Sequence, residues 1–169
     1  MYWQLLVVLI FALNLALLWS DKLAWWRLPG SLICAVLPLV TVFIPQPSFE
    51  LDYFWWRIVG GAAIVAGAAL IVWAQMALGR VLTNIGGTPA KLVTSGPYAF
   101  FRHPIYLGLV FVWVGWWWVF AAVYSFYCGM FILAAIWLQG YFEEKFVLEK
   151  SFGSKFKEYR QQTGMFWVK

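Results

Sequence analysis

The chain has 169 residues, of which 64% are hydrophobic and only 11% are charged, and this composition excludes an ordinary soluble globular domain. Its length suits one domain, and its apolar content indicates an integral membrane protein. The formal net charge is +5, and because the basic residues are sorted by loop as membrane topology requires, nucleic-acid binding is not needed to explain it.

The first three apolar runs are each long enough to cross a bilayer. Residues 1–19 have no basic residue before them and no small-residue cleavage site after them, so we interpret them as a retained span. Residues 23–44 form a second span, whose helix begins either in its first residues or near Ser31, and Pro38 predicts a kink. Residues 53–78 form a third, in which glycine and alanine recur at helical spacing; close helix packing is favoured there over a ligand groove.

A polar connection over residues 79–103 separates these spans from two more, at residues 105–121 and 124–142. After residue 142 the composition becomes charged, and aromatic residues recur every three to four positions among Glu and Lys. They are Phe142, Phe146, Phe152, Phe156 and Tyr159. This interval predicts an amphipathic helix on the bilayer or against the bundle. The predicted fold is therefore all-α, a polytopic bundle of about five transmembrane helices with a cytoplasmic amphipathic C-terminal helix.

The basic residues predict the orientation of the chain. With five spans, the loops after the first and third spans and the C-terminal tail share one side and hold eleven of the twelve Lys and Arg residues, Arg57 being the exception. The positive-inside rule then places these loops and the tail in the cytoplasm and the N-terminus outside. We treat residues 1–169 as one membrane domain, with three spans in residues 1–78 and a catalytic core in residues 79–169.

The only histidine lies in the longest polar interruption, at residues 91–106. His103 directly precedes Pro104, and proline suits the first turn of a helix, so His103 is predicted at or near the N-cap with Arg102 beside it. The free N–H groups and positive dipole end of a helix start favour an anionic ligand. Taken alone, the histidine could be only a cap.

A pair of carboxylates, Glu143 and Glu144, stands where the fifth span ends. Carboxylates at a membrane boundary can accept hydrogen bonds from hydroxyls or pair with a cation. Taken alone, they could be ordinary charges in the first turn of the tail helix. Their occurrence together with Arg102 and His103 favours a functional site.

In this order and spacing, four sequence blocks resemble the isoprenylcysteine carboxyl methyltransferase family and the related phospholipid methyltransferases. The blocks are residues 92–98, residues 102–108, Glu143–Glu144, and Phe152–Gly153 followed by Phe156 and Tyr159–Arg160. The similarity covers roughly residues 79–160, about half of the chain. Members of this family are membrane enzymes that use S-adenosylmethionine, so the resemblance implies a methyltransferase with that cofactor.

By the resemblance, the cofactor contacts the polar loop, the helix start and the exit of the fifth span. The implied contacts are Lys91, Leu92, Val93, Tyr98, His103, Pro104, Ile105, Tyr106 and Glu144. His103 suits the cofactor's carboxylate and Glu144 its amine or ribose hydroxyls, while Tyr98 and Tyr106 can flank the base or the sulfonium. No glycine-rich dinucleotide motif follows a strand pattern and the cysteines lack metal-ligand spacing, so we expect neither a Rossmann-type site nor a metal.

One position departs from the family pattern. The isoprenylcysteine enzymes have an arginine four residues before the second glutamate, associated with the substrate carboxylate, and this chain has Gly140 there. Arg102, Arg80 or Lys145 could replace it. Otherwise a lipid amine or a thiol is the more plausible acceptor, with Glu143 as proton acceptor. We assign the catalytic roles to Glu143 and Arg102.

The predicted function is methyl transfer from S-adenosylmethionine to a lipophilic acceptor at the cytoplasmic face of a bilayer. The acceptor is an isoprenylcysteine-like carboxylate, a phospholipid amine or a thiol. An alternative is a sterol-reductase-like enzyme that uses NADPH, which the small number of spans disfavours. A non-catalytic membrane scaffold would explain the spans but not the four blocks.

Overall fold

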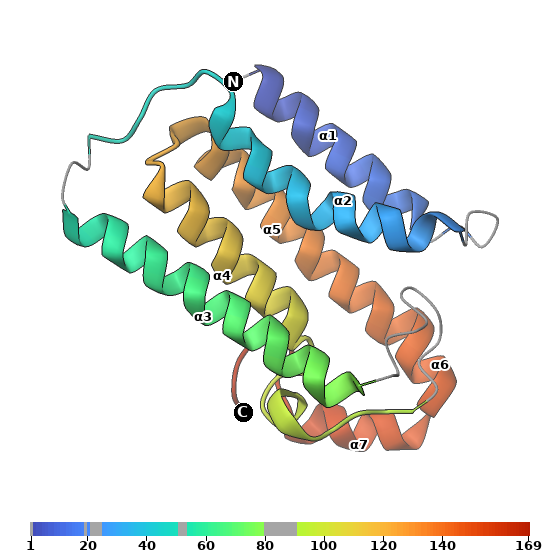
Figure 1. Ribbon diagram of the computed structural model, residues 1–169. Helices are drawn as coiled ribbons and strands as arrows, with labels where there is room; N and C mark the ends of the chain where they lie inside the picture. The colour runs from blue at the N-terminus through green and yellow to red at the C-terminus, as the bar shows by residue number, and fades with distance from the viewer. Residues whose placement is uncertain (1, 19, 21–24, 51–53, 80–90) are drawn as a thin grey trace.

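A computed structural model describes residues 2–18, 20, 25–50, 54–79 and 91–169. Within these ranges the chain is helical and has isolated β-bridges in place of strands. Five long helices lie side by side, and the chain then turns across one end of the bundle (Figure 1). The long helices are α1 (Tyr2–Leu17), α2 (Arg27–Val40), α3 (Phe54–Leu78), α4 (Pro104–Val119) and α5 (Val123–Glu143). The shorter segments are η2 (Thr41–Phe43), η4 (Gly96–Ala99), the π-helical η5 (Glu144–Leu148), α6 (Glu149–Phe152) and α7 (Ser154–Gln162).

Each of the five predicted apolar runs forms a helix. Among the described residues, two helices are long and apolar enough to cross a membrane, α3 and the continuous helix Val123–Phe152, while Tyr2–Leu17, Pro29–Phe43 and Pro104–Val119 are shorter apolar helices. Pro38 lies inside α2, and the backbone tightens into η2 three residues later. The all-helical fold is thus confirmed for the described ranges, and the five crossings and their orientation stay predictions.

Helices α3 and α4 touch backbone to backbone through glycines. A Cβ added at Gly67 would lie 2.5 Å from the carbonyl oxygen of Gly108, and one added at Gly115 would lie 2.6 Å from that of Gly60. Any larger residue would push the helices apart, so the small residues predicted to allow close packing do so against α4. This contact sets the position of the start of α4, where His103 lies.

Tryptophan side chains from α4 hold the other side of that helix against α2. Trp113 and Trp117 are buried, and their indole N–H groups donate to the carbonyls of Ala35, at 2.9 Å, and Pro38, at 3.0 Å. These two tryptophans therefore belong to the core, whereas tryptophan in a membrane protein usually marks the interface.

The charged tail differs from the single amphipathic helix that the aromatic interval predicts. The helix of α5 continues through η5 and α6 and ends at Gly153, whose φ of +53° is a conformation that favours glycine. Phe146 on the first part is 46% exposed, while Phe156 and Tyr159 on α7 are buried. The predicted aromatic face is therefore divided between two helices, and α7 uses its share to pack under the bundle (Figure 1).

Candidate functional site

The start of α4 and the exit of α5 meet in a buried ionic cluster. The Nε of Arg102 lies 2.7 Å from Oε1 of Glu144, and its Nη2 lies 3.2 Å from Oε2, a two-pronged arrangement. Nε2 of His103 lies 3.1 Å from the same Oε1. Glu144 is 4% exposed and His103 is 6% exposed. Glu144 comes 42 positions after Arg102 and 41 after His103, so folding brings it to the two basic residues of this Arg102–Glu144–His103 cluster.

The His103 side chain can contact Glu144 because it is not used to cap α4. His103 is the N-cap of α4 and Pro104 is its first residue, as predicted, but the histidine side chain makes no capping hydrogen bond. Its ring instead stacks on Tyr106, with centroids 5.3 Å apart and planes 2° from parallel. The hydroxyl of Tyr106 donates to Oε2 of Glu143 at 2.6 Å. Both glutamates are therefore bound to residues at the start of α4.

The helix containing the glutamates widens at this point. The π-helical segment η5 begins at Glu144, directly after the end of α5. Such wider turns are rare and occur frequently at functional sites. Glu144 is buried by the cluster, while its neighbour Lys145 is exposed.

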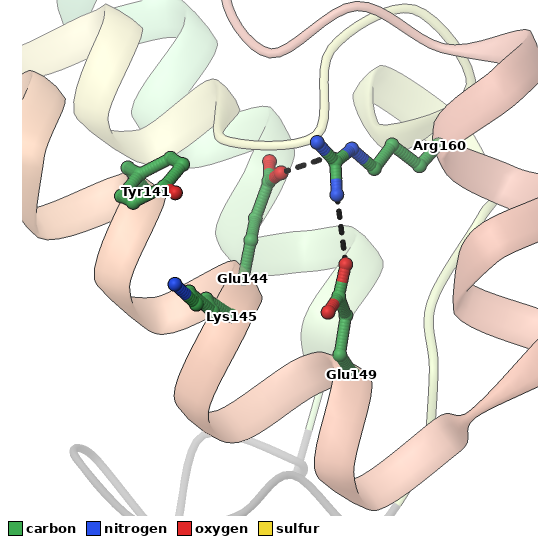
Figure 2. Close-up of a pocket in the computed structure, with 5 residues that line it drawn as sticks. All are labelled: Tyr141, Glu144, Lys145, Glu149 and Arg160. Atoms are coloured by element: carbon green, nitrogen blue, oxygen red, sulfur yellow. Dashed lines mark hydrogen bonds and ion pairs between the residues drawn. The ribbon is translucent and has the colours of Figure 1, made fainter.

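A polar pocket of about 140 Å³ opens beside Glu144. Figure 2 shows Arg160 of α7 reaching toward two glutamates of the preceding helix. Its Nη1 lies 2.7 Å from Oε1 of Glu149, and its Nε lies 4.0 Å from Oε2 of Glu144. Tyr141 and Lys145 complete the lining. The pocket therefore presents both signs of charge next to the buried cluster.

The segment after α7, residues 163–166, lies across the cluster, and we call it the strap. The backbone N–H of Arg102 donates to the carbonyl of Gly164 at 2.9 Å, and that of His103 donates to the carbonyl of Met165 at 3.3 Å. The guanidinium of Arg102 also donates to the carbonyl of Thr163. The strap is thus hydrogen-bonded to the backbone of both basic residues of the cluster, Arg102 and His103.

The strap also occupies the space beside Gly140, where the resembling enzymes have an arginine. A Cβ at Gly140 would lie 2.5 Å from Cε of Met165 and 3.6 Å from the ring of His103. A longer side chain at this position would have to displace the side chain of Met165. Of the three proposed replacements, Arg102 is bound to Glu144, Lys145 lines the polar pocket, and Arg80 lies outside the described residues.

The buried Tyr159 of α7 is hydrogen-bonded to the half-buried Tyr98 of the loop before α4. The hydroxyl of Tyr159 donates to the carbonyl of Tyr98 at 2.6 Å. Burial, and secondarily the negative charge of Glu143, raises the pKa of Tyr98 well above its ordinary range. Burial likewise raises the pKa of Tyr159. Both side chains therefore stay neutral near pH 7 and act as hydrogen-bonding groups.

Comparison with protein-family models matches residues 55–155 to the family described as phospholipid methyltransferase. The chain belongs to this family. The matched region runs from α3 into α7 and contains the whole ionic cluster, whereas α1 and the strap lie outside it. A comparison with curated proteins finds no match.

Family membership confirms the resemblance and supports a membrane methyltransferase in general. Methyltransferases of this family generally use S-adenosylmethionine. The sterol-reductase-like alternative is not favoured.

The remaining predicted cofactor contacts take no part in the hydrogen bonds described above. Lys91 is exposed on the segment that leads to η4, and Leu92 and Val93 are half-buried there. Pro104 is buried and Ile105 half-buried in the first turn of α4. Their contacts with a cofactor stay predictions.

The prediction of site residues missed two parts of the site. Arg160 falls in the last of the resembling sequence blocks, which was a signal for it. The strap had no such signal, because its contribution is made through backbone carbonyls.

Proposed function

We propose that this chain transfers a methyl group from S-adenosylmethionine to a lipid-soluble acceptor, at the end of the bundle where α4 begins and α5 ends. The observation that carries the proposal is the Arg102–Glu144–His103 cluster. It combines one carboxylate with two basic side chains at a helix start and is shielded from water. The distribution of basic residues supports a cytoplasmic position for this end of the bundle.

The donor set fits the amino-acid end of that cofactor. His103 at the start of α4 can donate to its carboxylate, and Glu144 can accept from its amine. The adjoining pocket of about 140 Å³ has room for a group of that size and is smaller than the roughly 300–1,000 Å³ of a complete ligand pocket. The rest of the cofactor then extends toward the other proposed contacts, which are Lys91, Leu92, Val93, Tyr98, Pro104, Ile105 and Tyr106.

The bound cofactor supplies a methyl group already attached to a good leaving group, so the protein chiefly has to orient the acceptor and exclude water. Glu143 is placed to accept a proton from an amine or thiol acceptor at its carboxylate. The hydrogen bond from Tyr106 holds that carboxylate in one orientation. Arg102 contributes by holding Glu144.

The surroundings of Gly140 favour an acceptor without a carboxylate. Glycine has no side chain, so no cation projects from position 140, and the side chain of Met165 lies in the adjacent space. Arg102 is already bound to Glu144 and to the strap. A lipid amine or a thiol is therefore the acceptor that the site suits best.

Calorimetry on the purified protein in detergent tests the cofactor. We expect binding of S-adenosylmethionine or S-adenosylhomocysteine and none of NADPH; the opposite preference would overturn the proposal. A transfer assay with labelled cofactor over prenylcysteine, phosphatidylethanolamine and thiols identifies the acceptor. In that assay Glu143→Gln is expected to lower turnover by about 10²–10⁴ while cofactor affinity is retained.

A further inference from the structure

The ion pair that Arg160 makes in the polar pocket is in contact with water and can exchange its partner. Nη1 of Arg160 lies 2.7 Å from Oε1 of Glu149, and Figure 2 shows the guanidinium between Glu149 and Glu144. The side chains of Arg160 and Glu149 are 49% and 28% exposed, and ion pairs of this kind contribute little. Arg102, in contrast, is buried against Glu144 and bonded to the strap. A ligand in the pocket can therefore replace Glu149 at Arg160 far more easily than it can replace Glu144 at Arg102.

Glu144 gives the same pocket an acceptor for a cation. It lines the pocket, and its Oε2 lies 3.2 Å from Nη2 of Arg102 and 4.0 Å from Nε of Arg160. A carboxylate oxygen can accept two hydrogen bonds, and the distance to Arg160 is too long for one, so Oε2 has capacity for a further donor. The pocket thus offers an acceptor at Glu144 and a donor at Arg160 with their nearest atoms 4.0 Å apart.

This pair of groups matches the two charges of an α-amino acid. Such a group carries its amine and its carboxylate on one carbon atom, so the partners of the two charges have to lie close together. We propose that Arg160 exchanges Glu149 for the carboxylate of S-adenosylmethionine and joins His103 in binding it, while the amine lies at Glu144. The inference rests on the proposed function and deepens it by naming the residue that distinguishes the cofactor from analogues without a carboxylate.

Lys145 is the other cation in the lining of the pocket. Its Nζ lies 6.0 Å from the ring centroid of Tyr141 and 5.7 Å from that of Phe146, so the ammonium is placed over aromatic rings. An ammonium is a point charge, whereas the planar guanidinium can donate two parallel hydrogen bonds to one carboxylate. We therefore assign the carboxylate to Arg160.

Calorimetry in detergent with two ligands tests the assignment without requiring activity. The ligands are S-adenosylhomocysteine and the same compound without its carboxylate, decarboxylated S-adenosylhomocysteine. The wild type should prefer the intact ligand. Arg160→Gln should reduce this preference about tenfold, the scale of a charge-assisted hydrogen bond, by weakening the binding of S-adenosylhomocysteine alone. Unchanged affinity for the decarboxylated ligand shows at the same time that the variant is folded.

A second variant tests the exchange of partners. Glu149→Gln removes the group that competes for Arg160, so it should tighten the binding of S-adenosylhomocysteine about two- to fivefold, the scale of an exposed ion pair. The decarboxylated ligand should bind this variant as it binds the wild type. Lys157→Gln removes an exposed cation from the same helix as Arg160 and is the matched control, which should leave both affinities unchanged.

The outcomes separate this inference from the proposed function. If the wild type binds S-adenosylhomocysteine but shows no preference over the decarboxylated ligand, the inference is overturned and the proposed function stands. The same holds if Arg160→Gln keeps the full preference or weakens both ligands equally, or if Glu149→Gln does not tighten binding. If the wild type binds neither ligand, the proposed function fails and the inference fails with it.

Discussion

The ion pair between Arg102 and Glu144 gives the sharpest test of the site. Glu144→Gln removes the negative charge but keeps the shape of the side chain. The side chains of Arg102 and Glu144 are only 8% and 6% exposed, so the substitution leaves a buried guanidinium without its counter-ion. Breaking a buried pair in this way costs about 3–5 kcal/mol. We expect the lower end, about 3 kcal/mol, because the glutamine oxygen can still accept a hydrogen bond.

The assay is a double-mutant cycle in detergent, in which the free energy of unfolding is measured for Glu144→Gln, Arg102→Met and the double variant. Because the two side chains are in direct contact, the double variant should lose less than the sum of the single losses, with a coupling energy of about 2 kcal/mol. Glu149→Gln is the control, since it removes the partner of the half-exposed Arg160 and should cost below about 1 kcal/mol. Additive losses at residues 102 and 144 would refute the buried pair.

The remaining predictions concern the histidine, the glycine contact between α3 and α4, and a buried tyrosine. His103→Ala should weaken S-adenosylhomocysteine binding in calorimetry about tenfold, the scale of one charge-assisted hydrogen bond, and unchanged affinity would refute its role. Gly67→Val should lower the unfolding free energy by about 1–3 kcal/mol, because its Cβ would lie 2.5 Å from a carbonyl oxygen of α4. Gly61→Val, where a Cβ meets nothing within 4 Å, is its control, and equal losses would contradict the packing. Because burial raises the pKa of Tyr159, its contribution to stability is fully present below about pH 10 and is lost as the pH rises toward the folded-state pKa. In alkaline denaturation the Tyr159→Phe variant should therefore lose less stability above pH 10 than the Tyr2→Phe variant, which changes an exposed tyrosine and keeps Tyr159. An equal loss in the two variants would contradict this reasoning.

The helices and the start of α4 could be predicted because local signals determine them. Apolar runs of membrane length produce the helices, and Pro104 determines where α4 begins. The proximity of His103 to Glu144 was implied by the family resemblance, by which both residues contact the same cofactor although they lie far apart in the chain. Both predictions depend on features that can be read within a few neighbouring residues or within a known motif.

Other parts of the site depend on tertiary contacts and had no local signal. The strap uses the backbone carbonyls of Gly164 and Met165, so its side chains do not reveal its role. The turn at Gly153 divides the predicted tail helix. A glycine in a charged helical segment does not by itself indicate a positive φ. Trp113 lies in the core because α2 offers it a carbonyl partner, which a preference of tryptophan for interfaces cannot anticipate.

The place where the cofactor binds is the central claim, and photo-crosslinking tests it most directly. The protein in detergent would be irradiated with S-adenosylmethionine labelled in its methyl group, and the labelled peptides would be mapped. We predict saturable label, competed by S-adenosylhomocysteine, in peptides that contain His103 or Glu144. Saturable label confined to peptides of α1 and α2, or label that S-adenosylhomocysteine does not compete, would contradict the account.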